Sequence, residues 1–188
     1  MAAALTILFL LGATLGTALD GIHSHFGATA YTHPVFWKAA WWVPLLFGGA
    51  FTIGLIRPLL ERLVSPRTSP ASSVRRTPRP SWPSVLGPFA IFIAAYFVTV
   101  APLAWPYVTG LVTLMFLVSW ATFDRSPIQL AIALAAGFGG PAIESLLVSQ
   151  GLFRHLQTLA FGVPGWLPAL YLTASVALCR LALRLVDR

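Results

Sequence analysis

One acid, Glu144, lies well inside an apolar stretch and is the residue whose chemistry most needs explaining. It follows Gly137, Gly139, Gly140 and Pro141, which weaken or bend a helix. Because a charge in hydrocarbon costs about a few kcal/mol, we expect this carboxyl group to face the interior of a helix bundle. There it would contact the polar head of a ligand. Helix capping and proton transfer are the alternatives.

A second acid, Asp20, precedes His23, His25 and His33, and His155 lies in a later segment expected on the same side of the membrane. Imidazoles and a carboxylate together can bind zinc. An HxH pair in a loop is a weak signal, and hydrated loop histidines are the simpler interpretation. We therefore predict no metal site and assign Asp20 to the head of the same ligand.

An adjacent acid and base, Asp124 and Arg125, lie in the stretch Trp120–Ser126, at the end of a long apolar run. Such a pair at a membrane boundary predicts a contact site for a membrane-protein partner. A local ion pair or helix caps would explain the same residues, and an exposed pair contributes only about 0 to 1 kcal/mol.

Catalytic motifs are missing from the sequence: it has no acyl-transfer triad, GxSxG elbow, HExxH pair, P-loop or dinucleotide fingerprint. Cys179 is the one cysteine, so no disulfide can form within the chain. We predict a protein that is not an enzyme and has no cofactor apart from a bound membrane lipid.

The elements that position these residues follow from composition. The 188 residues are 57% hydrophobic, with a mean hydropathy of +0.82, too apolar for one soluble core. Continuous apolar runs of about 20 residues predict membrane helices, and hence an all-α, six-helix transmembrane bundle forming a single domain over residues 1–188. The predicted spans are Ala2–Leu19, Ala40–Ile56, Val85–Val100, Leu103–Phe123, Ile128–Ser149 and Trp166–Leu185.

Charge sets the orientation of these spans. All basic residues except Lys38 and Arg154 fall on one side of a six-span topology, and positively charged loops remain cytoplasmic. Both termini are therefore expected in the cytoplasm, and the net charge of +7 does not indicate a nucleic-acid partner. Residues 57–84, rich in proline and arginine, predict a mobile cytoplasmic loop.

Small residues predict close helix packing, either within the bundle or between subunits. We expect a homo-oligomer, for which a trimer is one candidate. No internal repeat is evident. The small-xxx-small pairs are Gly12 and Gly16, Ala50 and Gly54, and Ala136 and Gly140.

Three segments together resemble the Insig family of sterol-sensing membrane proteins: Ala40–Pro44, Trp120–Ser126 and Gly165–Pro168. The resemblance covers roughly residues 38–183 and implies six helices with cytoplasmic termini. The resemblance also implies that, as in the animal members, a lipid such as a sterol binds within the bundle and the bundle then engages membrane partners. The aspartate that the family uses in partner engagement is matched by Asp124.

Two positions depart from the family pattern, Ser119 and Tyr107, so we expect a lipid other than a sterol. These two residues join Asp20 and Glu144 as predicted lipid contacts, and Asp124 and Arg125 are the predicted partner contacts. The prediction is a lipid-binding protein, and so a candidate lipid sensor, of the bacterial inner membrane. Its ligand would be sterol-like or diacylglycerol-like, and diacylglycerol is preferred. A membrane adaptor without a ligand and a small-solute transporter are the alternatives.

Overall fold

The predicted all-α bundle is confirmed: six helices of the computed structural model are long and apolar enough to cross a membrane. Residues 1–64 and 79–186 are described. The elements are α1 (Ala2–Leu11), a π-helical turn (Gly12–Gly16), α2 (Thr17–His25), β1 (Thr29–Tyr31), α3 (Val43–Thr52), a 3₁₀ turn (Ile53–Leu55), α4 (Ile56–Val64), α5 (Trp82–Thr99), α6 (Trp105–Phe123), α7 (Pro127–Ser149), β2 (Phe153–His155) and α8 (Leu167–Leu185).

The first span combines α1, the π-helical turn and α2, and the second combines α3, the 3₁₀ turn and α4. Both spans are longer than predicted: the first reaches His25 instead of Leu19, and the second reaches Leu63 instead of Ile56. Helical structure therefore includes the first residues of the predicted 57–84 loop, and α5 begins at Trp82. The rest of that predicted loop, residues 65–78, lies outside the described residues.

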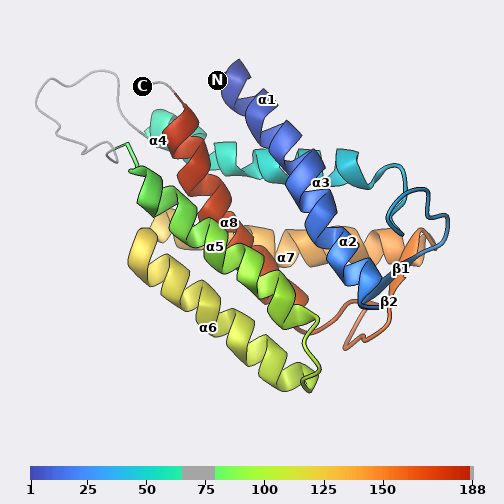
Figure 1. Ribbon diagram of the computed structural model, residues 1–188. Coiled ribbons are helices and arrows are strands. Elements are labelled where there is room, and N and C mark those ends of the chain that lie inside the picture. Colours follow the sequence, from blue (N-terminus) through green and yellow to red (C-terminus); the bar gives the residue numbers. More distant parts are fainter. Residues whose placement is uncertain (65–78, 187–188) are drawn as a thin grey trace, which may run out of the picture.

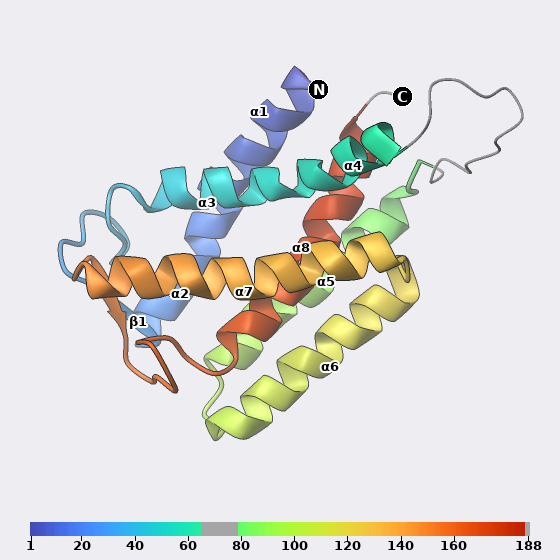
Figure 2. The same cartoon turned by 180° about the vertical axis from the view of Figure 1, so that it is seen from behind.

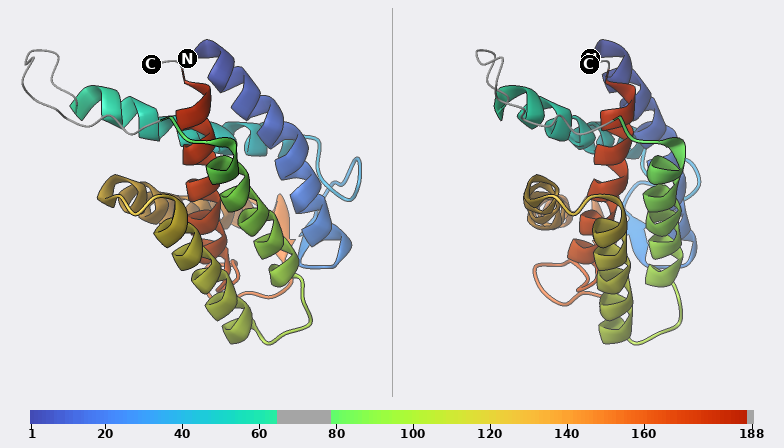
Figure 3. Two further views of the ribbon diagram at one scale, coloured as in Figure 1. Left: turned by 60° about the vertical axis from the view of Figure 1, so that its left-hand side comes forward. Right: turned by 90° about the vertical axis from the view of Figure 1, so that its left-hand side faces the viewer.

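Helix α8 forms the centre of the bundle, and two thirds of its apolar window is buried, more than in any other span (67%). Helices α5, α6 and α7 pack against it. The second span and α7 run side by side and cross α8, whereas α1–α2, α5 and α6 follow another direction (Figures 1 and 2). The second span and α7 therefore lie on one side of α8, and α5 lies on the other side (Figure 3).

A short antiparallel sheet joins the two segments that follow α2 and α7. Thr29 pairs with His155 and Tyr31 with Phe153, so that Ala30 lies opposite Arg154 at the centre. This exchange of first and last partners is what a local two-fold axis through the central pair produces.

The two segments also share their backbone conformation, which reveals an internal repeat that the sequence did not. Gly27 and Gly151 have φ of 75° and 70°, and Trp37 and Phe161, at the same interval along the chain, have φ of 47° and 52°. Positive φ is uncommon outside glycine, so its recurrence is a strong signature. The same turns are closed by matching bridges, Phe36 to Ala39 and Ala160 to Val163.

The repeat extends into the helices. At the same interval, the span containing α1 and α2 corresponds to α7, and the span containing α3 and α4 corresponds to α8. Gly54 and its counterpart Leu178 meet where their helices cross, and a Cβ on Gly54 would lie 2.5 Å from the Leu178 carbonyl oxygen. Glycine is needed here because the two backbones approach too closely for a side chain.

Candidate functional site

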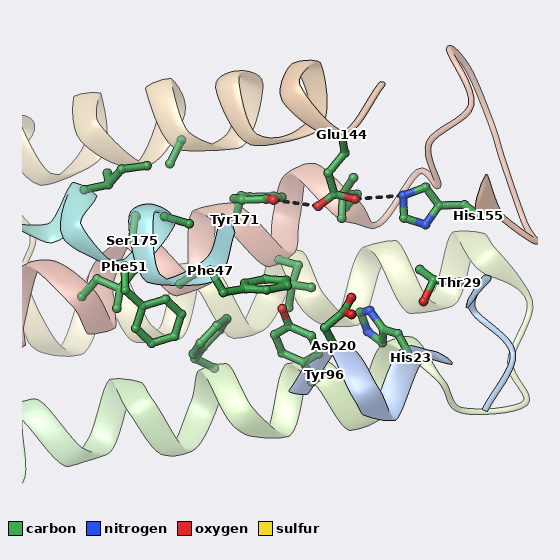
Figure 4. A pocket seen from close by; sticks show the side chains of 18 residues that line it. Asp20, His23, Thr29, Phe47, Phe51, Tyr96, Glu144, His155, Tyr171 and Ser175 are labelled. Carbon is green, nitrogen blue, oxygen red and sulfur yellow. Dashed lines mark hydrogen bonds and ion pairs between the residues drawn. The ribbon is translucent and has the colours of Figure 1, made fainter. Parts of the chain in front are cut away.

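A cavity of about 60 Å³ lies between the two repeats, beneath the sheet. Its polar end is formed by side chains from both repeats, and the rest of its wall is mainly apolar (Figure 4). No lysine or arginine is among the described residues that line it. The polar lining residues are Asp20, His23, Thr29, Tyr96, Glu144, His155, Tyr171 and Ser175.

Glu144, on α7, is held by two donors. The Tyr171 hydroxyl donates to Oε1 at 2.6 Å, and His155 Nε2 lies 2.8 Å from Oε2 (Figure 4). Gly140, one turn before the acid, has no room for a side chain, because a Cβ there would lie 2.4 Å from the Tyr171 ring. This glycine therefore lets the tyrosine lie close against α7 and reach the acid.

Asp20, on α2, is held in the same way, with the Tyr31 hydroxyl donating to Oδ2 at 2.8 Å. Burial first, and then the charge of Asp20, raises the pKa of Tyr31 above its usual range. The hydroxyl consequently remains protonated and able to donate. Because Tyr31 belongs to β1, the sheet fixes the donor and α2 fixes the acceptor.

The two acids are counterparts in the repeat. Asp20 corresponds to Glu144, and its donor Tyr31 corresponds to the donor His155. The predicted lipid contacts Asp20 and Glu144, far apart in sequence, are therefore brought together in one cavity. The geometry gives the cavity two carboxylates, each oriented by a donor from the strand that follows its own helix.

His23 and His155, which sequence analysis interpreted as hydrated loop histidines, are instead buried. His23 Nε2 lies 2.7 Å from Thr99 Oγ1, and the Thr99 hydroxyl donates to the Tyr96 carbonyl. Thr99 thus accepts from the imidazole, and the His23 ring stacks on Tyr96 with centroids 4.6 Å apart. Within the described residues, no three His, Cys, Asp or Glu side chains converge as metal ligands would.

A larger apolar groove continues from the cavity. Its volume is about 680 Å³, and it runs between the second span and α7 with Tyr171 at its base. Leu45 and Ile143 on its rim are exposed, and in a membrane helix such side chains face hydrocarbon. The residues shared by cavity and groove are Phe47, Ala50, Ile53, Ala136, Glu144 and Tyr171.

The other two predicted lipid contacts lie elsewhere, outside the lining of both cavity and groove. Tyr107 lies near the start of α6 and is 71% exposed. Ser119 lies near the end of the same helix, is fully buried, and its hydroxyl has no hydrogen-bond partner among the described residues. The structure therefore brings together the two acids but does not place these α6 residues beside them.

The predicted partner contact Asp124 is buried at the corner between α6 and α7, with 9% of its surface exposed. Its Oδ1 accepts from the Ser126 backbone N–H at 3.1 Å, and its Oδ2 lies 3.5 Å from an Arg57 nitrogen. The second contact is too long for a good hydrogen bond and is an ion pair. Its neighbour Arg125 is exposed and donates to the Ala121 carbonyl.

Arg57 is the residue that sequence reasoning missed, because it was assigned to the loop. It is buried in α4, where it donates to Glu61 at 3.0 Å and to the Ser126 hydroxyl at 2.6 Å. Ser126 in turn accepts from the Gln129 N–H and so caps α7. The acid at the corner therefore pairs across the bundle, with α4, instead of with the adjacent arginine.

The fold and site define the class: a six-span membrane protein in which two repeats, of two spans each, flank a cavity with acidic side chains. Comparisons with known proteins show which proteins the chain is similar to. The chain is 26% identical to insulin-induced gene 1 protein of Danio rerio over 177 residues, covering 90% of this chain and 67% of that protein. It is 26% identical to insulin-induced gene 2 protein of Xenopus tropicalis, covering 92% and 78%.

Solved structures agree with these sequence similarities. The mycobacterial Insig homologue MvINS from Mycobacterium vanbaalenii matches with a TM-score of 0.78 at 27% identity, over 97% of this chain and 94% of that chain. A cross-linked trimer of an MvINS variant matches with a TM-score of 0.81 at 26% identity. No family model matches the sequence. The chain is an Insig homologue, as its sequence segments predicted.

Proposed function

We propose that this Insig homologue binds one neutral membrane lipid, with its polar head in the cavity and its acyl chains in the groove. The continuity of the two spaces carries the proposal, because Glu144 and Tyr171 line both. A groove of about 680 Å³ is within the usual range of ligand sites, about 300 to 1,000 Å³.

The chemistry of the polar end favours a neutral, hydroxyl-bearing head. Asp20 and Glu144 offer carboxylate oxygens, which accept hydrogen bonds from a ligand hydroxyl. A phosphate would need basic partners to offset its desolvation, and none is among the described lining residues. Diacylglycerol, with one free hydroxyl and two chains, is the preferred ligand. A sterol has the same pairing of hydroxyl and apolar body.

Retention of added dioleoylglycerol by purified protein during gel filtration tests this function. Glu144→Gln keeps the shape of the side chain but removes the negative charge that would strengthen a hydrogen bond from the hydroxyl of the ligand. A charge-assisted hydrogen bond contributes about 1.5 to 3 kcal/mol, so we expect retention to fall by about tenfold or more. Unchanged retention would show that the head does not lie at this acid.

Gly139→Leu tests the acyl-chain site separately. Gly139 lines the groove, and a Cβ there meets nothing within 4 Å, so the larger side chain fills the groove without disturbing the fold. Gly110→Leu is the matched control, because Gly110 lies on α6 with equally open space and is not a lining residue. Lower retention for Gly139→Leu alone supports the proposal, whereas equal retention in both variants contradicts it.

We infer further that the protein is a non-enzymatic homo-oligomer of the bacterial inner membrane. The crystallised cross-linked trimer of MvINS and its mycobacterial source support this assignment, as do the six spans. The bound lipid would make the bundle a lipid sensor, in keeping with the sterol-sensing role implied by the family resemblance. Crosslinking, together with the detergent-corrected mass, tests the subunit number. A single monomeric species would contradict the trimer.

The second candidate function is an adaptor that docks a membrane-protein partner at Asp124 and Arg125. The exposure of Arg125 favours it. Asp124, in contrast, is paired with Arg57, so direct contact with a partner requires the corner to open. Arg125→Ala should abolish partner recovery without changing lipid retention if the adaptor function holds.

A further inference from the structure

Arginines gather where α5 begins and α8 ends, on the side that the charge distribution assigns to the cytoplasm. Arg180 and Arg184 lie one turn apart on α8, which packs along α5 (Figure 1). Arg79 precedes α5, and its Nε–H donates to the Arg184 carbonyl at 3.2 Å. We call these three residues the basic cluster. They lie outside the lining of both the cavity and the groove.

The side chains of the basic cluster are held by neutral partners. Arg180 donates to the Ser84 carbonyl at 3.4 Å and to the Ser84 hydroxyl at 2.9 Å. Arg184 donates to the Pro80 carbonyl at 3.3 Å, and its guanidinium carbon lies 5.0 Å from the centre of the Trp82 ring. Neither arginine forms an ion pair within the described residues. The guanidinium groups are therefore oriented, but their charges are not neutralised by these contacts.

Arg57 shows how a buried arginine on the same side of the membrane is neutralised. It is paired with both Glu61 and Asp124. Like charges one helical turn apart, as in Arg180 and Arg184, instead repel each other. An anion bound between the guanidinium groups of the cluster would offset this repulsion.

The fold does not require a basic cluster at this place. At the interval that relates the two repeats, Arg180 and Arg184 correspond to Ile56 and Leu60, which line the apolar groove. The preference for basic residues on the cytoplasmic side sets how many positive charges lie there. It does not require that their guanidinium groups be held together, so the ordering of the cluster needs a separate explanation.

The apolar surface beside the cluster indicates that the anion belongs to a lipid. Trp82 and Leu86 lie one turn apart at the start of α5 and are 50% and 60% exposed, whereas Val85 is buried. Exposed apolar side chains of a membrane helix face hydrocarbon, and tryptophan favours the level of the lipid headgroups. An anion at the cluster would therefore lie at headgroup depth, and acyl chains attached to it would pack on Leu86.

We propose that the basic cluster binds the headgroup phosphate of an anionic phospholipid in the cytoplasmic leaflet. Guanidinium groups bind phosphate oxygens through paired, charge-assisted hydrogen bonds, and basic pockets between membrane helices suit anionic headgroups. The cavity, in contrast, offers acidic side chains to a neutral head. The protein would thus bind two chemically different lipids at two separate places, and the phospholipid site does not depend on the neutral lipid.

Native mass spectrometry of delipidated protein, with dioleoylphosphatidylglycerol or dioleoylphosphatidylcholine added, tests this site. We expect wild type to bind phosphatidylglycerol several-fold more tightly than phosphatidylcholine, whose head carries a cation. Arg79→Gln should lower the affinity for phosphatidylglycerol about tenfold, because it removes a charge-assisted hydrogen bond. Arg79 is exposed and donates only to a backbone carbonyl within the described structure, so its substitution leaves the fold intact.

Arg62→Gln is the matched control, because Arg62 is an exposed arginine of α4 outside the cluster. It removes the same charge from the same side of the membrane and should change the affinity by less than about twofold. Equal binding of the two lipids by wild type, or an equal loss in Arg79→Gln and Arg62→Gln, would overturn the proposal. Displacement of phosphatidylglycerol by millimolar inorganic phosphate would overturn the assignment to a lipid in favour of a free anion.

Discussion

The buried ion pair at the α6–α7 corner gives a quantitative prediction. Arg57 and Asp124 have side chains that are only 3% and 6% exposed. Removing one partner of such a pair leaves an uncompensated buried charge, at a cost of about 3 to 5 kcal/mol. Because their contact is 3.5 Å and not a good hydrogen bond, we take the lower end, about 3 kcal/mol, for Arg57→Met.

Thermal unfolding in detergent measures this cost. For a chain of this length, about 3 kcal/mol corresponds to a fall in Tm of about 6 to 12 °C. Asp124→Asn in the Arg57→Met background should recover part of the loss, because the unpaired charge is then gone. The coupling should persist at high salt, since a buried pair is weakly screened.

Arg125→Met is the matched control, because Arg125 is adjacent to Asp124 in sequence but exposed. We expect a change in stability within about 0.5 kcal/mol, as for other surface substitutions. Equal destabilisation by Arg57→Met and Arg125→Met, or a larger effect of Arg125→Met, would refute the assignment of the acid to the cross-bundle pair.

Three further predictions follow from the packing of the repeats. Gly54→Ala should lower the Tm markedly, because its Cβ would lie 2.5 Å from the Leu178 carbonyl oxygen, whereas Gly110→Ala, with open space, should not; thermal unfolding compares the two. Tyr31→Phe removes the hydroxyl that donates to Asp20 and should lower the free energy of unfolding by about 1 kcal/mol relative to wild type. Cys179, fully buried, should react with a maleimide only when the protein unfolds, and rapid labelling of folded protein would contradict the central position of α8.

The spans were predictable because hydropathy and length are local properties of the sequence, and all six were found, although the first continues to His25 and the second to Leu63. The loop that begins at 57 was the exception. Arg57 was counted as a loop residue from its charge alone, but its ion pair and hydrogen bonds offset the burial and allow the helix to continue. Such a partner, distant in sequence, has no local signature.

The repeat escaped sequence analysis for a related reason: it is conserved in backbone conformation more than in side chains. Thr29–Tyr31 and Phe153–His155 share no residue, although they adopt paired strands. A sequence signal was nevertheless present, since both returning helices begin with tryptophan and proline separated by one residue, as in Trp42 and Trp166. Aligning these two would also have aligned Asp20 with Glu144.

The central claim is that the two repeats enclose a site for one neutral lipid, and native mass spectrometry with lipid extraction tests it most directly. The protein would be purified gently from its own membrane. We predict one neutral, hydroxyl-bearing lipid per chain. A bare protein, or a mixture of bulk phospholipids without fixed stoichiometry, would contradict the claim.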